Sequence, residues 1–413
     1  MAQGIVILAS IAFFGSLLLG QLGGLIVAPG VVVYVHDIIL VGVLILFGMR
    51  KITTNPKSSF RLGLPILVFI GSGVLSLLGN WTRFPKGEIL VSALYLVRWA
   101  SYAGLYFIVQ WDLMPSFWLD GLFWVGTGFG LVGFAQYFLY PDLRNLSYLG
   151  WDPHYYRLFS TLLDPNFVGI ILVLTLFLGL RRLEAARTIK NGLLFVCALV
   201  ALILTYSRGS YLAFVTGFLF WSAVRRQWTY GLVLLVIFAI GIVSAPLRNL
   251  EILRIDRRET ALARVGNWRE TIGLIIRSPL IGHGFNTLRY ITRTPQIKTD
   301  MTLSRAGAGV DSSVLFVGAS IGFIGLVSFG WLAWKAIGIA RLLLSRKQTK
   351  SIGVAVAGSM VALFVHSMFA NSLFYPWVMV WFWILMGSAE RMIIFGRKRG
   401  AQFSSRYQLR RLR

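Results

Sequence analysis

Long apolar runs, repeated along almost the whole chain, restrict its possible folds more than any other feature. Crossing the hydrocarbon core of a bilayer takes roughly 20 consecutive apolar residues in a helix. Runs near that length cover residues 4–28, 31–49, 64–79, 89–110, 117–140, 162–180, 191–206, 209–224, 229–245, 311–340, 351–371 and 373–395. The 413 residues are 57% hydrophobic and only 13% charged, unlike a soluble domain. The sequence therefore predicts an all-α membrane protein with about 12 transmembrane helices.

The first run is predicted to be a retained transmembrane helix. No charged region precedes it, no small-residue cleavage site follows it, and it is longer than the core of a signal peptide. The single Cys197 lies within a predicted span, which excludes a disulfide framework and a cysteine-based metal site.

The distribution of the basic residues predicts the orientation. The formal net charge is +25, and 22 of the 40 Lys and Arg residues fall in the loops and the tail on the side of the N-terminus. The short loops on the other side hold only Arg83, Lys86, Arg144, Arg157 and Arg208. Because short cytoplasmic loops are enriched in Lys and Arg, both termini are predicted to face the cytoplasm.

This orientation divides the chain into four parts. Residues 1–245 carry nine predicted spans, 246–310 form one large outer loop, 311–395 carry three more spans, and 396–413 form a basic cytoplasmic tail. The tail is predicted to lie against anionic lipid. A nucleic-acid partner is not expected, because the charge follows the membrane topology.

The outer loop 246–310 is unusually rich in arginine. It contains eleven basic residues, ten of them Arg, against five acidic ones. The guanidinium fork binds phosphate oxygens two at a time, so the loop suggests a phosphate-bearing substrate. The alternative is a solvated basic loop that rests on lipid headgroups. Residues 254–277 have the apolar spacing of an amphipathic helix with Trp268 anchored at the membrane interface, ended by Ser278-Pro279.

Other polar features fall on the same side. The turn 204–210 holds Arg208, and Gly209 is predicted to let the chain reverse there. Residues 141–161 form a second outer loop, after which Pro165 is well placed to begin a helix.

Ionisable residues inside predicted spans are functional candidates by default. Asp37, Arg98 and His366 are in this class, whereas Lys335 lies close enough to a span end to reach the interface. The alternative for Arg98 and Asp37 is that they neutralise each other within the bundle.

Four sequence blocks resemble the O-antigen ligase and O-antigen polymerase superfamily of bacterial envelope glycosyltransferases. They are Arg157-Leu-Phe-Ser-Thr-Leu-Leu-Asp-Pro-Asn166, Thr205-Tyr-Ser-Arg-Gly-Ser210, Arg264-x-x-x-Trp268 with Ser278-Pro-Leu-Ile-Gly282, and Asp311-Ser-Ser-Val-Leu315 with Gly322-x-x-Gly325-Leu326. Each block alone is weak, and their order on one face gives the resemblance its specificity.

The resemblance implies transfer of a glycan from a polyprenyl-diphosphate carrier to a hydroxyl acceptor, on the periplasmic side of the bacterial inner membrane. The acceptor would be lipid A core, a growing glycan chain or a protein. Arg208 and Arg264 match the two arginines that would hold the diphosphate. The ligase branch places a histidine followed by Asn after the large loop, and this chain has Asp311 and Ser312 there. That difference favours a polymerase-type member.

The predicted catalytic set is thus Asp311, Arg208 and Arg264, with Arg157, Arg98, Asp37, Trp268 and His366 as substrate-binding candidates. Asp311 is expected either to activate the acceptor hydroxyl or to cap the next helix. Its place at a helix start is expected to ease its ionisation. No cofactor or metal is predicted, since the chain has no Asp-x-Asp motif.

Two other functions remain open on these residues. A transporter or flippase for an anionic lipid-linked glycan would use the same arginines, but would need polar groups that continue to the inner side. A non-catalytic scaffold of an envelope-assembly complex would not need Arg208 and Asp311 together.

Overall fold

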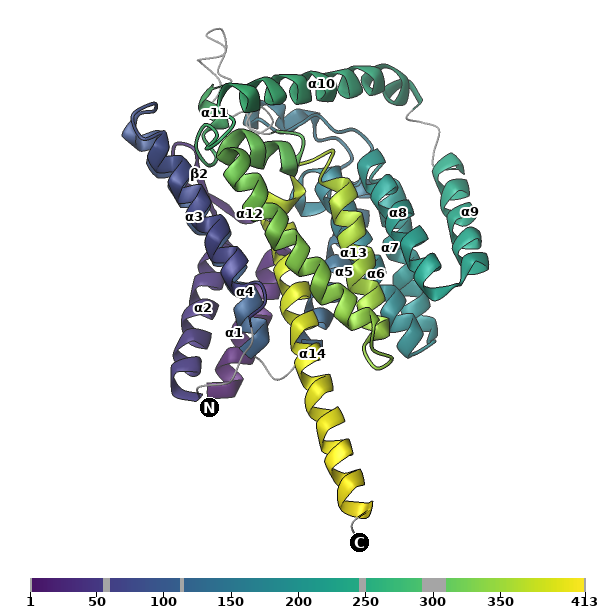
Figure 1. Cartoon of the computed structure of the whole chain (residues 1–413). Helices are drawn as coiled ribbons and strands as arrows, with labels where there is room; N and C mark the ends of the chain where they lie inside the picture. Colours follow the sequence, from purple (N-terminus) through teal and green to yellow (C-terminus); the bar gives the residue numbers. More distant parts are fainter. Residues whose placement is uncertain (1, 55–59, 112–114, 245–249, 292–309, 412–413) are drawn as a thin grey trace.

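The computed structural model describes residues 2–54, 60–111, 115–244, 250–291 and 310–411, which form a bundle of α-helices with one small β-hairpin (Figure 1). Its α-helices are α1 (Ala2–Leu17), α2 (Val35–Thr54), α3 (Gly63–Gly79), α4 (Lys86–Trp111), α5 (Pro115–Leu139), α6 (Pro165–Ala185), α7 (Ile189–Leu204), α8 (Arg208–Arg225), α9 (Trp228–Ser244), α10 (Leu250–Arg277), α11 (Leu288–Ile291), α12 (Ser313–Leu344), α13 (Lys350–His366) and α14 (Pro376–Arg411). Every apolar run predicted from the sequence overlaps one of these helices, so the predicted helical class is confirmed.

Membrane-spanning character is clear for part of the bundle. In the described ranges, five helices are long and apolar enough to cross a bilayer, namely α4, α5, α6, α12 and residues Pro376–Ile394 of α14. Shorter apolar helices lie within α1, α2, α3, α7, α9 and α13. The protein is a multi-pass membrane protein, and the number of about 12 crossings stays a prediction.

The first apolar run is not one helix, which corrects the prediction for residues 4–28. Helix α1 ends at Leu17, and the 3₁₀ turn η1 (Gly20–Gly23) leads into strand β1 (Gly24–Ala28). Strand β1 pairs antiparallel with β2 (Val31–Tyr34). The β-branched valines of β2 favour extended backbone, and Pro29-Gly30 between the strands is a turn sequence. Hydropathy alone does not distinguish such a hairpin from the end of a helix.

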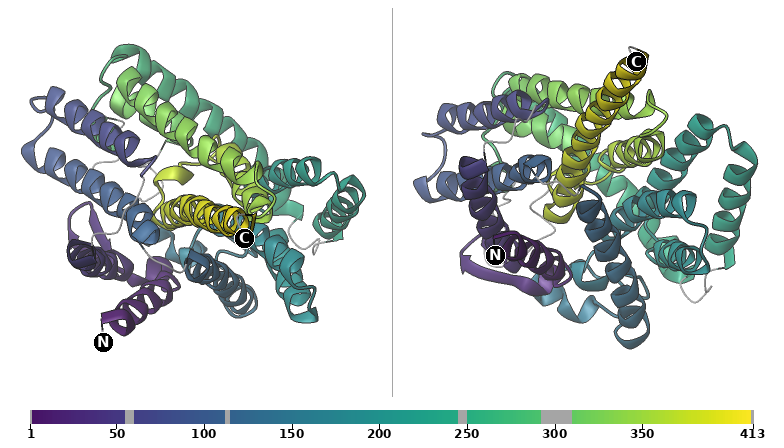
Figure 2. Two further views of the ribbon diagram at one scale, coloured as in Figure 1. Left: turned by 60° about the horizontal axis from the view of Figure 1, so that its bottom comes forward. Right: turned by 90° about the horizontal axis from the view of Figure 1, so that it is seen from below.

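Helix α14 runs through the middle of the bundle (Figure 2). It packs against α4, α5, α6, α12 and α13, and its Trp377, Trp381 and Trp383 are buried. Helix α6 is buried along most of its length as well. These two helices form the scaffold around which the others are arranged.

The two ends of the bundle differ. Helix α1 begins and α14 ends at one end, whereas α10 lies across the opposite end (Figure 1). The predicted interfacial helix 254–277 is confirmed as a helix: α10 ends at Arg277, directly before Ser278-Pro279. Its Leu262, Val265, Ile272 and Ile276 are exposed.

Candidate functional site

The candidate residues from distant parts of the chain gather at the α10 end of the bundle. Arg208 begins α8, Asp311 lies two residues before α12, and His366 ends α13. Arg264 and Trp268 lie one helical turn apart on α10. The ends of several helices and one crossing helix therefore build one polar region.

The turn that carries Arg208 is shaped by residues other than Gly209, which corrects that prediction. The left-handed residue is Tyr206, with φ 51°. The Ser207 side chain caps α8 by accepting a hydrogen bond from the Ser210 amide. Gly209 lies within the first turn of α8, and its Cα faces His366 and Phe369.

Arg157 supports this turn from the outer loop. Its Nε donates to the carbonyl oxygen of Thr205 at 3.0 Å, and its Nη2 donates to that of Tyr206 at 3.4 Å. The backbone amide of Leu158 adds a hydrogen bond to the carbonyl of Leu204 at 2.9 Å. These contacts give Arg157, predicted to bind substrate, a positioning role for the segment that ends in Arg208.

A buried chain of hydrogen bonds lies beneath Arg208. Ser207 Oγ donates to Asn166 Oδ1 at 2.9 Å and lies 2.9 Å from Ser210 Oγ. Ser210 Oγ is 3.2 Å from His366 Nε2, and His366 Nδ1 is 2.6 Å from Ser372 Oγ. Because His366 is only 1% exposed, it joins the ends of α6, α8 and α13 from within. Substrate contact, as predicted for it, is not available in this arrangement.

Asp311 is held by α10 through its backbone. Its amide donates to Asn267 Oδ1 at 3.0 Å, and its carbonyl accepts from Trp268 Nε1 at 3.5 Å. The cap of α12 is Ser312, whose side chain accepts from the Leu315 amide. The alternative in which Asp311 caps the helix is therefore wrong, and the Asp311 carboxyl is left for other contacts.

The electrostatic surroundings of Asp311 also differ from the expectation of easy ionisation. Burial raises the pKa of the Asp311 carboxyl; the positive charge of Arg264 lowers it and the negative charge of Asp152 raises it further. Arg264 also lies within Coulombic reach of His366. In the described ranges no ion pair joins Arg264 to Asp311.

Trp268 connects α10 to the end of α13. Its ring lies 6.0 Å from that of Phe369, centroid to centroid, and its indole N–H is bonded to Asp311. Phe369 also lies near Gly209, so the first turn of α8 and the Trp268 turn of α10 approach the same residue.

Three polar residues of the site were not among the predicted ones. Asp152 and His154 come from the loop 141–161, and Asp164 caps α6 by accepting a hydrogen bond from the Asn166 amide at 2.7 Å. Burial raises the pKa of Asp152 and of Asp164 and lowers that of His154 to about 3. Their positions depend on how the loop folds back, which no local sequence pattern shows. In the part of the chain that the structure describes, no three His, Cys, Asp or Glu residues could hold a metal ion.

Asp37 and Arg98 form a closed ion pair elsewhere in the bundle, with Arg98 in the middle of α4. Arg98 Nη2 pairs with Asp37 Oδ2, and its Nε donates to Asp37 Oδ1 at 3.2 Å. Tyr102 donates to the same carboxylate at 2.6 Å, and the Tyr34 amide does so at 2.9 Å. The structure thus agrees with the alternative that the two charges neutralise each other.

The motif glycines join the loop to α12. Gly322 has φ +72° inside α12 and breaks its helical geometry, and Gly282 has φ +65°. The Phe323 amide donates to the Pro279 carbonyl at 2.7 Å, and the Ile324 amide to that of Leu280 at 3.2 Å. A Cβ at either glycine would overlap the backbone of the other segment. These blocks are therefore structural, and they fix where α10 and Asp311 lie.

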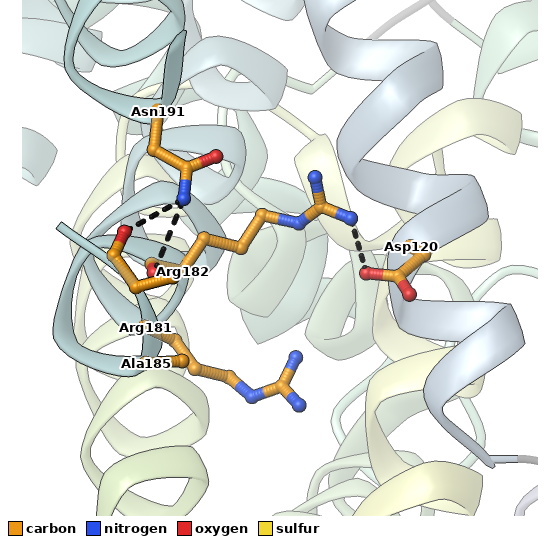
Figure 3. A pocket seen from close by; sticks show the side chains of 6 residues that line it. Asp120, Arg181, Arg182, Ala185 and Asn191 are labelled. Carbon is orange, nitrogen blue, oxygen red and sulfur yellow. Dashed lines mark hydrogen bonds and ion pairs between the residues drawn. The ribbon is translucent and has the colours of Figure 1, made fainter. Parts of the chain in front are cut away.

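Figure 3 shows a pocket at the C-terminal end of α6, where it meets α5 and the start of α7. Arg182 reaches across it to Asp120 at 2.6 Å, and Asn191 Nδ2 donates to the Ala186 carbonyl at 2.8 Å. Arg181 also lines this pocket. It contains none of the predicted site residues.

Comparison with known proteins supports the resemblance. Residues 193–330 match the family model described as O-antigen ligase. The matched segment runs from α7 into α12 and contains Arg208, Arg264 and Asp311. No curated protein matches the chain significantly. The match supports the likeness of this segment to the O-antigen ligase family.

Proposed function

We propose that the protein transfers a glycan from a polyprenyl-diphosphate carrier to a hydroxyl acceptor, at the α10 end of the bundle. This end would face the periplasm of a bacterial inner membrane, with both termini in the cytoplasm. One observation carries the proposal: Arg208, Arg264 and Asp311 converge at that end, and Asp311 lies within reach of the Arg264 charge without an ion pair to it.

Arg208 and Arg264 would bind the diphosphate of the donor. As the bond between the anomeric carbon and the diphosphate oxygen breaks, negative charge develops on that oxygen. Guanidinium groups placed beforehand around the leaving group stabilise this charge with little reorganisation. Gly209, next to Arg208, and Trp268, one turn from Arg264, both lie near Phe369, so we place the diphosphate between α8 and α10.

Asp311 would take the proton of the acceptor hydroxyl while the acceptor oxygen forms its bond to the anomeric carbon. A carboxyl whose pKa is raised by burial is a stronger base when ionised than a free Asp side chain. The positive charge of Arg264 opposes this rise of the Asp311 pKa and favours the ionised carboxylate. An Asp in place of the ligase histidine favours the polymerase-type reaction, in which the acceptor is another glycan.

A reconstituted assay tests the proposal directly. Purified protein in liposomes would be given an oligosaccharide linked to polyprenyl diphosphate. Products longer than one repeat would indicate a polymerase, and a single transfer to lipid A core or protein would indicate a ligase. The absence of product with every acceptor, together with movement of the donor across the bilayer, would identify a transporter.

The sidedness has its own test. In a Cys197→Ala background, a membrane-impermeant thiol reagent added outside is expected to modify Lys298→Cys and to miss Gln402→Cys. Lys298 lies outside the described residues, and Gln402 lies on the end of α14 beyond the bundle. The reverse labelling pattern would place the proposed site in the cytoplasm and contradict the reaction.

A further inference from the structure

A second polar location lies where the segment after α10 meets α4. Residues 278–291 are fixed there by hydrogen bonds to neighbouring helices. Ser76 Oγ donates to the Ile281 carbonyl at 2.6 Å, and Asn80 Nδ2 to the Gly282 carbonyl at 3.1 Å. The His283 amide donates to the Ala319 carbonyl at 3.0 Å. These bonds hold residues 281–283, just before α11, in a defined place against α3 and α12.

Two buried donors on this segment have no acceptor. Asn286 Nδ2 and Arg289 Nε are both buried and make no hydrogen bond. Both residues lie along α4: the Asn286 carbonyl accepts from Ser92, and the Arg289 guanidinium lies over the ring of Tyr95, three residues further along that helix. A buried polar group without a partner costs free energy that a bound acceptor would recover. Two such donors together on a well-packed segment indicate a place for an acceptor.

The backbone at Asn286 is held in a defined conformation next to α4. Asn286 has φ 59°, which few residues other than glycine adopt. Ser92 Oγ of α4 donates to its carbonyl at 3.5 Å, and the adjacent Thr287 and Leu288 are buried. The Asn286 backbone is thus held beside α4, and the Nδ2 of its side chain is buried.

The charge at this location is positive. The Arg289 guanidinium lies 4.7 Å from the Tyr95 ring centroid, and that of Arg98 lies 5.8 Å from the same ring. Arg98 is neutralised by Asp37. Within the described ranges, no ion pair joins Arg289 to an acidic residue. Of these two arginines, Arg289 is the one whose positive charge is not neutralised by an ion pair among the described residues.

We propose that Asn286 and Arg289 form a subsite for an anionic substituent, a carboxylate or phosphate, on the glycan substrate. This rests on the proposed glycan transfer and names a class of substrate for it. Phe285 lies between the subsite and the catalytic region, since its ring is 5.9 Å from Phe316 and 6.3 Å from Phe374. Phe374 belongs to η7 (Ser372–Phe374), whose Ser372 is bonded to His366. The subsite and the proposed catalytic residues thus flank one aromatic cluster, as parts of one extended glycan site would.

The test compares two glycans on the full-length protein in neutral-lipid nanodiscs. One glycan carries a carboxylate or phosphate, and its matched partner is carboxyl-reduced or dephosphorylated. Arg289→Gln is expected to raise the KM for the anionic glycan by about tenfold, the scale of one charge-assisted hydrogen bond. It should leave kcat and the neutral glycan unchanged. Asn286→Gly, which suits the left-handed backbone, should raise the same KM by a few fold, roughly one neutral hydrogen bond.

Arg277→Gln is the matched control. Arg277 is exposed in the last turn of α10 at the same end of the bundle, so this variant loses the same charge without touching α4. An equal effect of both variants on the anionic glycan would mean general charge attraction and would overturn the subsite.

Two further measurements separate the remaining outcomes. If Arg289→Gln instead removes a dependence of activity on added phosphatidylglycerol, the anion is a lipid headgroup and the glycan proposal is wrong. Equilibrium binding of both glycans is measured alongside transfer. A wild-type preference for the anionic glycan that Arg289→Gln abolishes supports the subsite even if no transfer occurs, whereas equal binding of the two glycans contradicts it.

Discussion

Two arginine–aspartate combinations in this bundle differ in how closely the two charges approach each other. Arg98 and Asp37 are in direct contact, and Tyr102 and the Tyr34 amide complete the coordination of the carboxylate. Arg264 and Asp311 influence each other only at longer range. A closed pair satisfies its own charges and stabilises the fold, whereas an open pair retains charge that a substrate can use.

The largest expected effect comes from opening the closed pair. Arg98→Gln leaves the Asp37 carboxylate buried without its cation, which costs about 3–5 kcal/mol for a pair of this kind. Thermal unfolding of the purified protein would show the loss. The double variant Asp37→Asn, Arg98→Gln should recover part of it, because no unpaired charge remains. Arg83→Gln, an exposed arginine near α4, serves as the control.

If Arg98→Gln left stability intact but abolished glycan transfer, Arg98 and Asp37 would take part in the reaction rather than stabilise the fold. The distinction between the two combinations would then fail.

The second largest effect is expected when Arg208 and Arg264 lose their two-pronged guanidinium groups. The variant Arg208→Lys, Arg264→Lys keeps both charges but loses the planar fork. Transfer should slow by roughly 100- to 1,000-fold, the scale of lost transition-state stabilisation of a developing anion. Unfolding temperature should stay near that of the parent. A fully active double variant would show that these arginines are only surface charge.

The smallest of the three effects is expected for Asp311→Asn. The amide cannot take a proton, so transfer should slow by about 100-fold while donor binding persists. Because Ser312 caps α12, the exchange should leave stability unchanged. A wild-type rate with this variant would remove Asp311 from the mechanism.

Asp311 also predicts a pH dependence. Its carboxyl must be ionised to accept the proton, and burial raises its pKa above the ordinary 3.8. Activity should therefore fall as the pH drops through that raised pKa, and this acid limb should disappear in Asp311→Asn. An unchanged acid limb in the variant would assign it to another group, such as Asp152.

The sequence predicted the helices and the residues that gather at one end, because hydropathy and charge placement follow directly from the membrane. It did not predict the hairpin of residues 24–34, since apolar strands and apolar helices have the same hydropathy. From the sequence, Arg157 and His366 were predicted to contact substrate. Their actual partners, the carbonyls of Thr205 and Tyr206 and the hydroxyl of Ser210, depend on tertiary packing.

The same limit applies to the glycines. Their spacing in the motifs was visible, but Gly282 and Gly322 are required because two backbones meet there. Sequence separation hides such a contact until the chain is folded. Gly209 is the opposite case, because the turn sequence suggested that this glycine was needed. The left-handed residue of that turn is instead Tyr206, three residues earlier.

The attachment of α10 to α12 at two points has a consequence for how chains with this fold could vary. Asn267 holds the Asp311 amide near one end, and the carbonyls of Pro279 and Leu280 hold the kink at Gly322. These two attachments hold α10, which carries Arg264, and the start of the α12 segment, which carries Asp311, in fixed relative positions. The length of the chain between residues 291 and 310 need not set their spacing. We therefore expect Arg264 and Asp311 to keep their relative positions when the length of that segment is changed.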